Sequence, residues 1–304
     1  MKAIRTDEDV QRELLKRRQF LTTAGGAGVA AAAAFLLPGK ANAVAPAQLD
    51  NTSGDTAEQI LTAALIAEDL ATVFYYNGLR GMVIEDPSLA GPGGTANKIS
   101  STGNAGNVSY LKAALIEEGT HATLFRNLLN SNVPSSDPYQ TFYFPTGTFD
   151  TLGAFTSMLN ALEDAFIGAY LAATLEFAQM ATDSRANGVR QPRATGGYYG
   201  AHELQWFSQV CASILGVEAE HRVLGRDLSN TVPPNQYVYE QTDGIATVFN
   251  GSASAVAALT PFLAAGSGLT AYSLHDAVSG SQSYKIAISG TALPPQPPAR
   301  GDGQ

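Results

Sequence analysis

Two segments placed 100 residues apart carry nearly the same pattern. Residues 115–128 read LIEEGTHATLFRNL, and residues 215–228 read LGVEAEHRVLGRDL. Both contain Glu-x-x-His, and Leu, Glu, His, Leu, Arg and Leu recur at the same offsets. The 304 residues include only four histidines, and this pattern contains two of them. Two copies of the motif within the same repeated pattern indicate an internal duplication. Such a duplication is stronger evidence for a shared site than a single Glu-x-x-His would be.

The duplication extends upstream of each motif. Glu-Asp at 68–69 is followed by Tyr75, and Glu-Asp at 163–164 is followed by Tyr170, so that a tyrosine lies seven residues after the glutamate in both copies. The motifs therefore occur in the order Glu, Glu-x-x-His, Glu, Glu-x-x-His along the chain. This order predicts two helical hairpins related by duplication.

The sequence predicts four amphipathic helices joined by segments rich in Gly, Pro and polar residues. They cover about 55–79, 107–130, 151–182 and 201–228. A capping box at Asp55–Glu58 marks the start of the first helix. Residues 133–149, between the second and third helices, contain three prolines and alternating aromatic residues, which favours an extended crossover with a short strand pair. Such a crossover is what a bundle with parallel neighbouring helices needs.

Ionisable residues of the repeat fall within the apolar faces of these helices. Apolar or small residues recur every three or four positions and trace one buried face on each helix. Six ionisable side chains share these faces: Glu68, Glu118, His121, Glu163, Glu218 and His221. A buried carboxylate is costly unless it is paired or coordinated. Two divalent cations would balance four carboxylates, which predicts a metal centre.

The spacing and the ligand types narrow the kind of metal. Glu and His three residues apart lie on the same side of a helix, so that each pair can reach one cation. Carboxylate oxygen combined with imidazole nitrogen suits iron or manganese, and zinc less specifically. No catalytic residue is predicted beyond the six ligands themselves.

Four polar residues near the ligands have less certain roles. Tyr75 and Tyr170 lie about 10 Å along the helix from their glutamates. We interpret them as core residues, with a hydrogen bond to a ligand or an electron relay as the alternative. Asp69 and Asp164 are candidates to orient a ligand histidine through its other nitrogen, although they lie off the apolar face.

The remaining candidates are predicted to have no part in the site. Glu117 competes with Glu118 as the ligand, but Glu118 fits the apolar face and the Glu-x-x-His spacing, so Glu117 is expected to face solvent. Glu220, which adjoins His221, is expected to do the same. Cys211 is the only cysteine and is expected in the core, and with a single cysteine the chain can form no internal disulfide. His202 and His275 fit no constellation and are predicted to be surface or capping residues.

The motifs as a set resemble the ferritin-like superfamily, with the ligand order of rubrerythrin-type and bacterioferritin-type domains. Among its branches the chain is most similar to the exported ferritin-like domain family that includes desiccation-related proteins. The resemblance covers roughly residues 55–230 and fills all six ligand positions. It implies an all-α fold, namely a ferritin-like four-helix bundle with a long crossover between helices two and three, followed by a C-terminal extension at 231–304.

The resemblance also implies how the ligands divide between two iron or manganese ions. Glu68 and Glu163 would be terminal or bridging carboxylates, whereas Glu118 and Glu218 would bridge or chelate. The histidine of each motif would bind one metal. Such a centre would react with dioxygen or peroxide, as in ferroxidase-like or catalase-like oxidoreductases. The chain lacks the rubredoxin-type cysteine pairs of a rubrerythrin-style peroxidase.

The N-terminal residues resemble a twin-arginine signal peptide. The sequence KRRQFL at 16–21 leads into a small, apolar run at 22–37 and an Ala-x-Ala site ending at Ala43. We therefore expect a signal at 1–43 followed by a linker at 44–54, with export to the periplasm or the cell exterior. The apolar run is shorter than the roughly 20 residues of a membrane-spanning helix, so no stable span is expected after cleavage.

Composition limits the partners. A net charge of −9 argues against nucleic acid or anionic membrane. The expected partners are a small-molecule oxidant or a metal ion, and a homodimer is the assembly considered. The C-terminal extension is predicted to hold one more helix near 244–264 and a Pro-rich tail from 294. The alternative function is a non-catalytic stress or desiccation-related envelope protein with a structural metal site; iron storage is a weaker third option.

Overall fold

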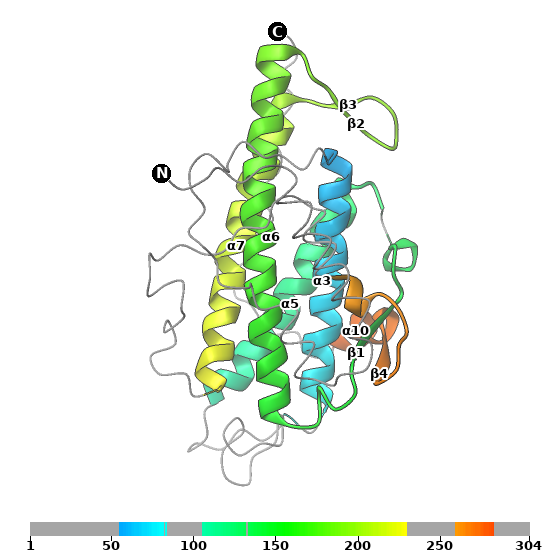
Figure 1. Cartoon of the computed structure of the whole chain (residues 1–304), viewed down its shortest axis with the longest axis vertical. Coiled ribbons are helices and arrows are strands. Elements are labelled where there is room, and N and C mark those ends of the chain that lie inside the picture. Colours follow the sequence, from blue (N-terminus) through cyan, green and yellow to red (C-terminus); the bar gives the residue numbers. More distant parts are fainter. Residues whose placement is uncertain (1–54, 82, 84–104, 132, 230–258, 283–304) are drawn as a thin grey trace, which may run out of the picture.

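Four long helices lie side by side in the part of the chain that the structure describes (Figure 1). The computed structural model describes residues 55–81, 83, 105–131, 133–229 and 259–282. The four helices are α3 (Ala57–Arg80), α5 (Ala105–Leu128), α6 (Leu152–Asn187) and α7 (Ala201–Leu228). The described residues are mostly helical, which confirms the predicted all-α class. The predicted signal peptide, the linker and the Pro-rich tail lie outside the described residues.

The capping residue of the first helix lies one position later than predicted. Thr56, not Asp55, is the capping residue: its hydroxyl accepts a hydrogen bond from the Gln59 amide, and the Gln59 side chain accepts one from the Thr56 amide. Glu58 is unavailable for this role because its carboxylate accepts bonds from the Ala194 amide and the Tyr199 hydroxyl. The capping box therefore exists, shifted by one position.

Contacts near the helix ends establish the helix directions. The end of α3 packs on the start of α6, where a Cβ on Gly78 would clash with the Phe155 ring. The start of α5 lies beside the end of α7, where Asn107 donates to Asp227. A short connection at 188–200 makes α6 and α7 antiparallel. It follows that α5 and α6 run parallel, and residues 129–151 connect opposite ends of the molecule.

Part of this connection pairs with the C-terminal region. Strand β1 (Thr141–Pro145) pairs in antiparallel fashion with β4 (Leu269–Ser273), whereas the sequence had predicted a strand pair within the crossover itself. The reason is apolar packing: Phe144 is fully buried and its ring lies 5.7 Å from Phe74 and 5.4 Å from Phe262. The strand pair thus fastens the C-terminal region to α3.

The C-terminal region contains a helix that the sequence reading did not locate. Helix α10 (Leu274–Ser281) packs on α3, and η4 (Thr260–Phe262) is a single 3-10 turn. Most of the helix predicted near 244–264 lies outside the described residues. At the other end, α6 continues to Asn187 and is followed by a small hairpin of β2 (Gln191–Pro192) and β3 (Tyr198–Tyr199). Among the described helices, none combines the length and the apolar character needed to cross a membrane.

Candidate metal centre

All six predicted ligand residues meet at one place between the four long helices. Each helix contributes: Glu68 from α3, Glu118 and His121 from α5, Glu163 from α6, Glu218 and His221 from α7. The side chain of His121 is 13% exposed, and the other five residues are fully buried or nearly so. These six residues face the core because they occupy the same three- or four-residue spacing as the apolar residues of each helix.

The six side chains form two overlapping groups of four. The first group contains Glu68, Glu118, His121 and Glu218, and the second contains Glu118, Glu163, Glu218 and His221. Within each group one donor atom per residue lies within 4.8 Å of all the others. Glu118 and Glu218 belong to both groups. This arrangement could hold a metal ion.

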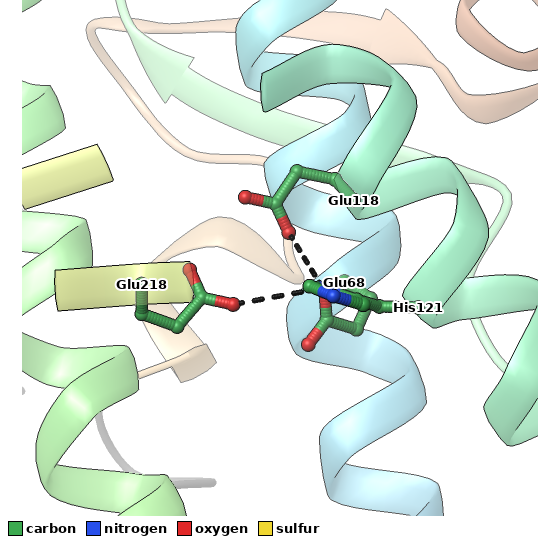
Figure 2. A group of neighbouring side chains, drawn as sticks. All are labelled: Glu68, Glu118, His121 and Glu218. Atoms are coloured by element: carbon green, nitrogen blue, oxygen red, sulfur yellow. Dashed lines mark ion pairs between the residues drawn. The ribbon is translucent and has the colours of Figure 1, made fainter. Parts of the chain in front are cut away.

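Donor atoms of the first group converge on the His121 ring (Figure 2). Its Nδ1 lies 3.3 Å from a Glu68 oxygen and 3.7 Å from an oxygen of each of Glu118 and Glu218. In the second group, His221 Nδ1 lies 2.9 Å from Glu118 and 3.5 Å from Glu218. Both histidines therefore present the same ring nitrogen to the carboxylates.

Most donor atoms of the cluster are buried without a hydrogen bond. These are one oxygen each of Glu68 and Glu163, both oxygens of Glu118 and Glu218, and Nδ1 of both histidines. Several lie at ion-pair distance from one another, but their alignment does not meet hydrogen-bond geometry. Buried polar atoms are rarely left in this condition, because each costs roughly 1–3 kcal/mol. The donor set therefore fits a bound cation.

Burial and mutual repulsion shift the acid–base properties of the site. Burial, followed by the Glu218 carboxylate, raises the pKa of Glu163 well above its ordinary value. Burial also raises the pKa of Glu118 and that of Glu218. Burial lowers the pKa of each histidine, but the surrounding carboxylates outweigh it and the net pKa lies well above the ordinary value. All these shifts favour proton binding by the metal-free cluster.

Two tyrosines connect the halves of the site crosswise. Tyr75 of α3 donates a hydrogen bond to Glu163 Oε1 of α6 over 2.7 Å. Tyr170 of α6 donates one to Glu68 Oε1 of α3. The structure therefore supports the alternative role, a hydrogen bond to a predicted ligand residue, over simple core packing. The separation along each tyrosine's own helix was misleading because the bonded glutamate belongs to the other helix.

The two aspartates contact arginines, which differs from the predicted contact with a ligand histidine. Asp69 accepts a hydrogen bond from a terminal nitrogen of Arg126, and Nε of the same arginine donates to Asp137 over 2.6 Å. Burial raises the pKa of Asp69 to about 8, although Arg126 opposes the shift. Asp164 accepts a bond from Arg222 over 3.3 Å. Because each aspartate follows its glutamate by one residue, it points about 100° away around the helix, toward these arginines.

Glu117 is the residue that sequence reasoning missed. It is 44% exposed, as expected of a solvent-facing residue, yet its Oε2 lies 2.9 Å from Nε2 of the buried His221. The sequence contained one sign that Glu117 differs from its counterpart, because the corresponding position in the second copy of the repeat is the apolar residue Val217. Glu220, by contrast, is exposed, as predicted, and contacts Tyr110.

The other candidates lie where the sequence placed them. Cys211 is buried and unbonded to another cysteine, and burial together with the nearby Glu68 raises its pKa far above the ordinary value. His202 is exposed beside Arg185, and His275 is exposed beside Asp276.

Comparisons with known proteins yielded no match. No protein-family model, no curated protein and no solved structure is significantly similar to the chain. The geometry and the chemistry of the cluster are therefore the features that indicate a function.

Proposed function

We propose that this chain is a ferritin-like carboxylate protein that holds two iron or manganese ions and reacts with dioxygen or peroxide. The observation that carries the proposal is the pair of overlapping four-residue groups that share Glu118 and Glu218. Four carboxylates carry four negative charges at most, and two divalent cations would balance them. Proteins of the ferritin-like di-iron and di-manganese class use this ligand set, a Glu from each of two helices and Glu-x-x-His from each of the other two.

The helix arrangement supports the same class. Parallel α5 and α6 joined by a long connection are the topology of ferritin-like bundles, in which the ligands project inward from facing helices. Carboxylate and imidazole donors without a thiolate favour iron or manganese over softer metals. Cys211 is the only cysteine in the chain, and it is not among the residues of either group.

Residues of the chain would supply the surroundings for oxidant chemistry. Bound iron or manganese would supply reversible one-electron oxidation toward dioxygen or peroxide. The buried glutamates accept hydrogen bonds from the Tyr75 and Tyr170 hydroxyl groups, which keeps a proton beside each of Glu163 and Glu68. The slight exposure of His121 leaves the first group nearest to solvent. A ferroxidase-like oxidation of ferrous iron and a catalase-like disproportionation of peroxide both agree with these features.

The proposal includes export through the twin-arginine system. The basic, apolar and Ala-x-Ala segments at 1–43 support it. Such systems generally carry folded proteins, so the metals would be inserted before export.

A second candidate function is a non-catalytic envelope protein in which the metals are structural. Its support is that the six side chains come from every one of the four long helices, so that cations would cross-link them. Metal binding to a folded site adds directly to folding stability.

Metal analysis of the natively exported protein tests the proposal. We expect iron or manganese at close to two ions per chain, and less than about half an equivalent of the two metals together would contradict it. Glu118→Ala should abolish binding, whereas Glu220→Ala on the exposed face of α7 should leave it unchanged. Oxidant turnover and circular dichroism of these variants separate the candidates: loss of folding in Glu118→Ala without any turnover in the wild type favours the structural role.

A further inference from the structure

The two histidines of the cluster have unequal surroundings. His221 is completely buried, its Nε2 lies 2.9 Å from Glu117 Oε2, and the Tyr75 ring packs edge-on at 5.6 Å. The side chain of His121 is 13% exposed. Within the part of the chain that the structure describes, Nε2 of His121 makes no hydrogen bond. Among the described residues, the His221 imidazole is thus contacted from three sides, whereas the His121 imidazole is contacted by the carboxylates of its own group.

The sequence explains this difference at a single pair of positions. Glu117 immediately precedes Glu118 on α5, and it reaches across to His221 on α7. In the second copy the corresponding residue on α7 is Val217, which has no acceptor to offer His121. Both copies of the repeat therefore contain the predicted ligands, but only the first copy contains a carboxylate at the position that contacts the histidine of the other copy.

A carboxylate behind an imidazole has a specific chemical effect. When Nε2 carries the proton and donates it to Glu117, Nδ1 keeps its lone pair directed at Glu118 and Glu218. The hydrogen bond also fixes the ring orientation and makes Nδ1 a better donor to a cation. Removal of such a partner typically lowers metal affinity by about 10- to 100-fold.

We propose that the two cation positions are unequal and that Glu117 sets the difference. The position formed with Glu163 and His221 retains its cation, and the position formed with Glu68 and His121 exchanges its cation with solvent. Glu117 is a positioning residue, because it acts through His221. The inference rests on the proposed function, since it assigns different properties to the two proposed ions.

Manganese titration of the metal-free, full-length chain tests the inference. Electron paramagnetic resonance of free Mn²⁺ should show two binding steps whose affinities differ by about tenfold or more. Crystals grown with one equivalent of Mn²⁺ should show anomalous scattering beside Glu163 and His221. Glu117→Val should weaken the tighter step by about tenfold or more and leave the weaker step unchanged. Glu117→Gln keeps an acceptor and should restore part of the loss.

The repeat supplies the reciprocal variant. Val217→Glu should tighten the weaker step, and the double exchange of Glu117→Val with Val217→Glu should reverse the order in which the positions fill. Glu220→Val, on the exposed face of α7, is the control and should change neither step.

Three outcomes would overturn the inference. Two steps unchanged by Glu117→Val, or weakened equally by it, would remove the positioning role while leaving the proposed function intact. Anomalous scattering that appears first beside Glu68 and His121 would reverse the assignment. A wild type that binds neither Mn²⁺ nor Fe²⁺ would overturn the proposed function and this inference together.

Discussion

The two halves of the helical core carry the same motifs in different surroundings. The α3–α5 half and the α6–α7 half each supply one Glu, one Glu-x-x-His and one tyrosine that bonds to the opposite half. Around these shared residues the halves differ: the pairs at corresponding repeat positions are Glu117 and Val217, Leu111 and Cys211, and Phe125 and Gly225. The two halves thus agree at the six residues of the cluster and at the two tyrosines, and they differ at other positions around them.

The largest expected effect concerns the carboxylates that belong to both groups of four. Glu118→Gln removes a carboxylate from both groups of four, and Glu68→Gln removes one from a single group. The first variant should bind almost no Mn²⁺ and lose the metal-dependent stabilisation, about 4 kcal/mol when free metal exceeds the Kd a thousandfold. The second should retain about one equivalent. Metal analysis measures the bound Mn²⁺, and urea unfolding with and without Mn²⁺ measures the stabilisation. Equal losses of Mn²⁺ binding in the two variants would contradict the distinction between residues of one group and residues of both groups.

A second prediction concerns the packing difference at Phe125 and Gly225. A Cβ on Gly225 would fall 2.5 Å from Asn160 Oδ1 and 3.1 Å from the Leu159 side chain, so α6 and α7 depend on this glycine for their close approach. Gly225→Ala should lower the free energy of unfolding by about 2 kcal/mol, because overpacking outweighs the better helix propensity of alanine.

Gly216 provides the matched control on the same helix. A Cβ there would meet no atom within 4 Å. Gly216→Ala should therefore raise the free energy of unfolding by up to about 1 kcal/mol. Urea unfolding of both variants would show opposite signs, and destabilisation by both would mean that helix packing is not the cause.

The sequence was sufficient for the parts of the structure that repeat. Apolar spacing located the four long helices, and the duplicated motif located all six residues of the cluster, because ionisable residues on a buried face need a partner. Partners contributed by a different helix could not be found this way. The hydrogen bond from Tyr75 to Glu163, the arginines beside the aspartates and the pairing of β1 with β4 all join segments that no local pattern relates.

The third prediction concerns a property that both halves have in common. Burial raises the pKa of Glu163 above the unfolded value of 4.5, and the carboxylates raise the pKa of both histidines above 6.5 despite burial. In each case the folded metal-free protein binds the proton more tightly than the unfolded chain, so its stability falls as pH rises from the unfolded pKa through the folded pKa.

Thermal unfolding at several pH values measures this dependence. The metal-free protein should lose up to about 1.4 kcal/mol per pH unit for each proton released, starting above pH 5. With saturating Mn²⁺ the trend should reverse, because the cation competes with these protons. The same falling trend with and without Mn²⁺ would mean that the cation does not replace protons in the cluster.

The smallest expected effect tests whether the crosswise tyrosines are equivalent. Tyr75→Phe leaves Glu163 Oε1 without its donor, and Tyr170→Phe does the same to Glu68 Oε1. Each should lower the stability of the metal-free protein by about 1 kcal/mol, the ordinary contribution of one hydrogen bond. Each should also weaken Mn²⁺ binding, because the freed carboxylate loses its fixed orientation.

Tyr76→Phe is the control for both tyrosine variants, because the Tyr76 hydroxyl accepts a bond from Arg80 away from the cluster. It should leave the affinity for Mn²⁺ unchanged whatever its effect on folding. If Tyr75→Phe and Tyr170→Phe weaken Mn²⁺ binding to the same degree, the two halves are equivalent at this level. Their inequality would then arise behind the histidines, where Glu117 faces His221 and Val217 occupies the matching position. A larger effect of one tyrosine would instead place part of the inequality in the hydrogen bonds to Glu68 and Glu163.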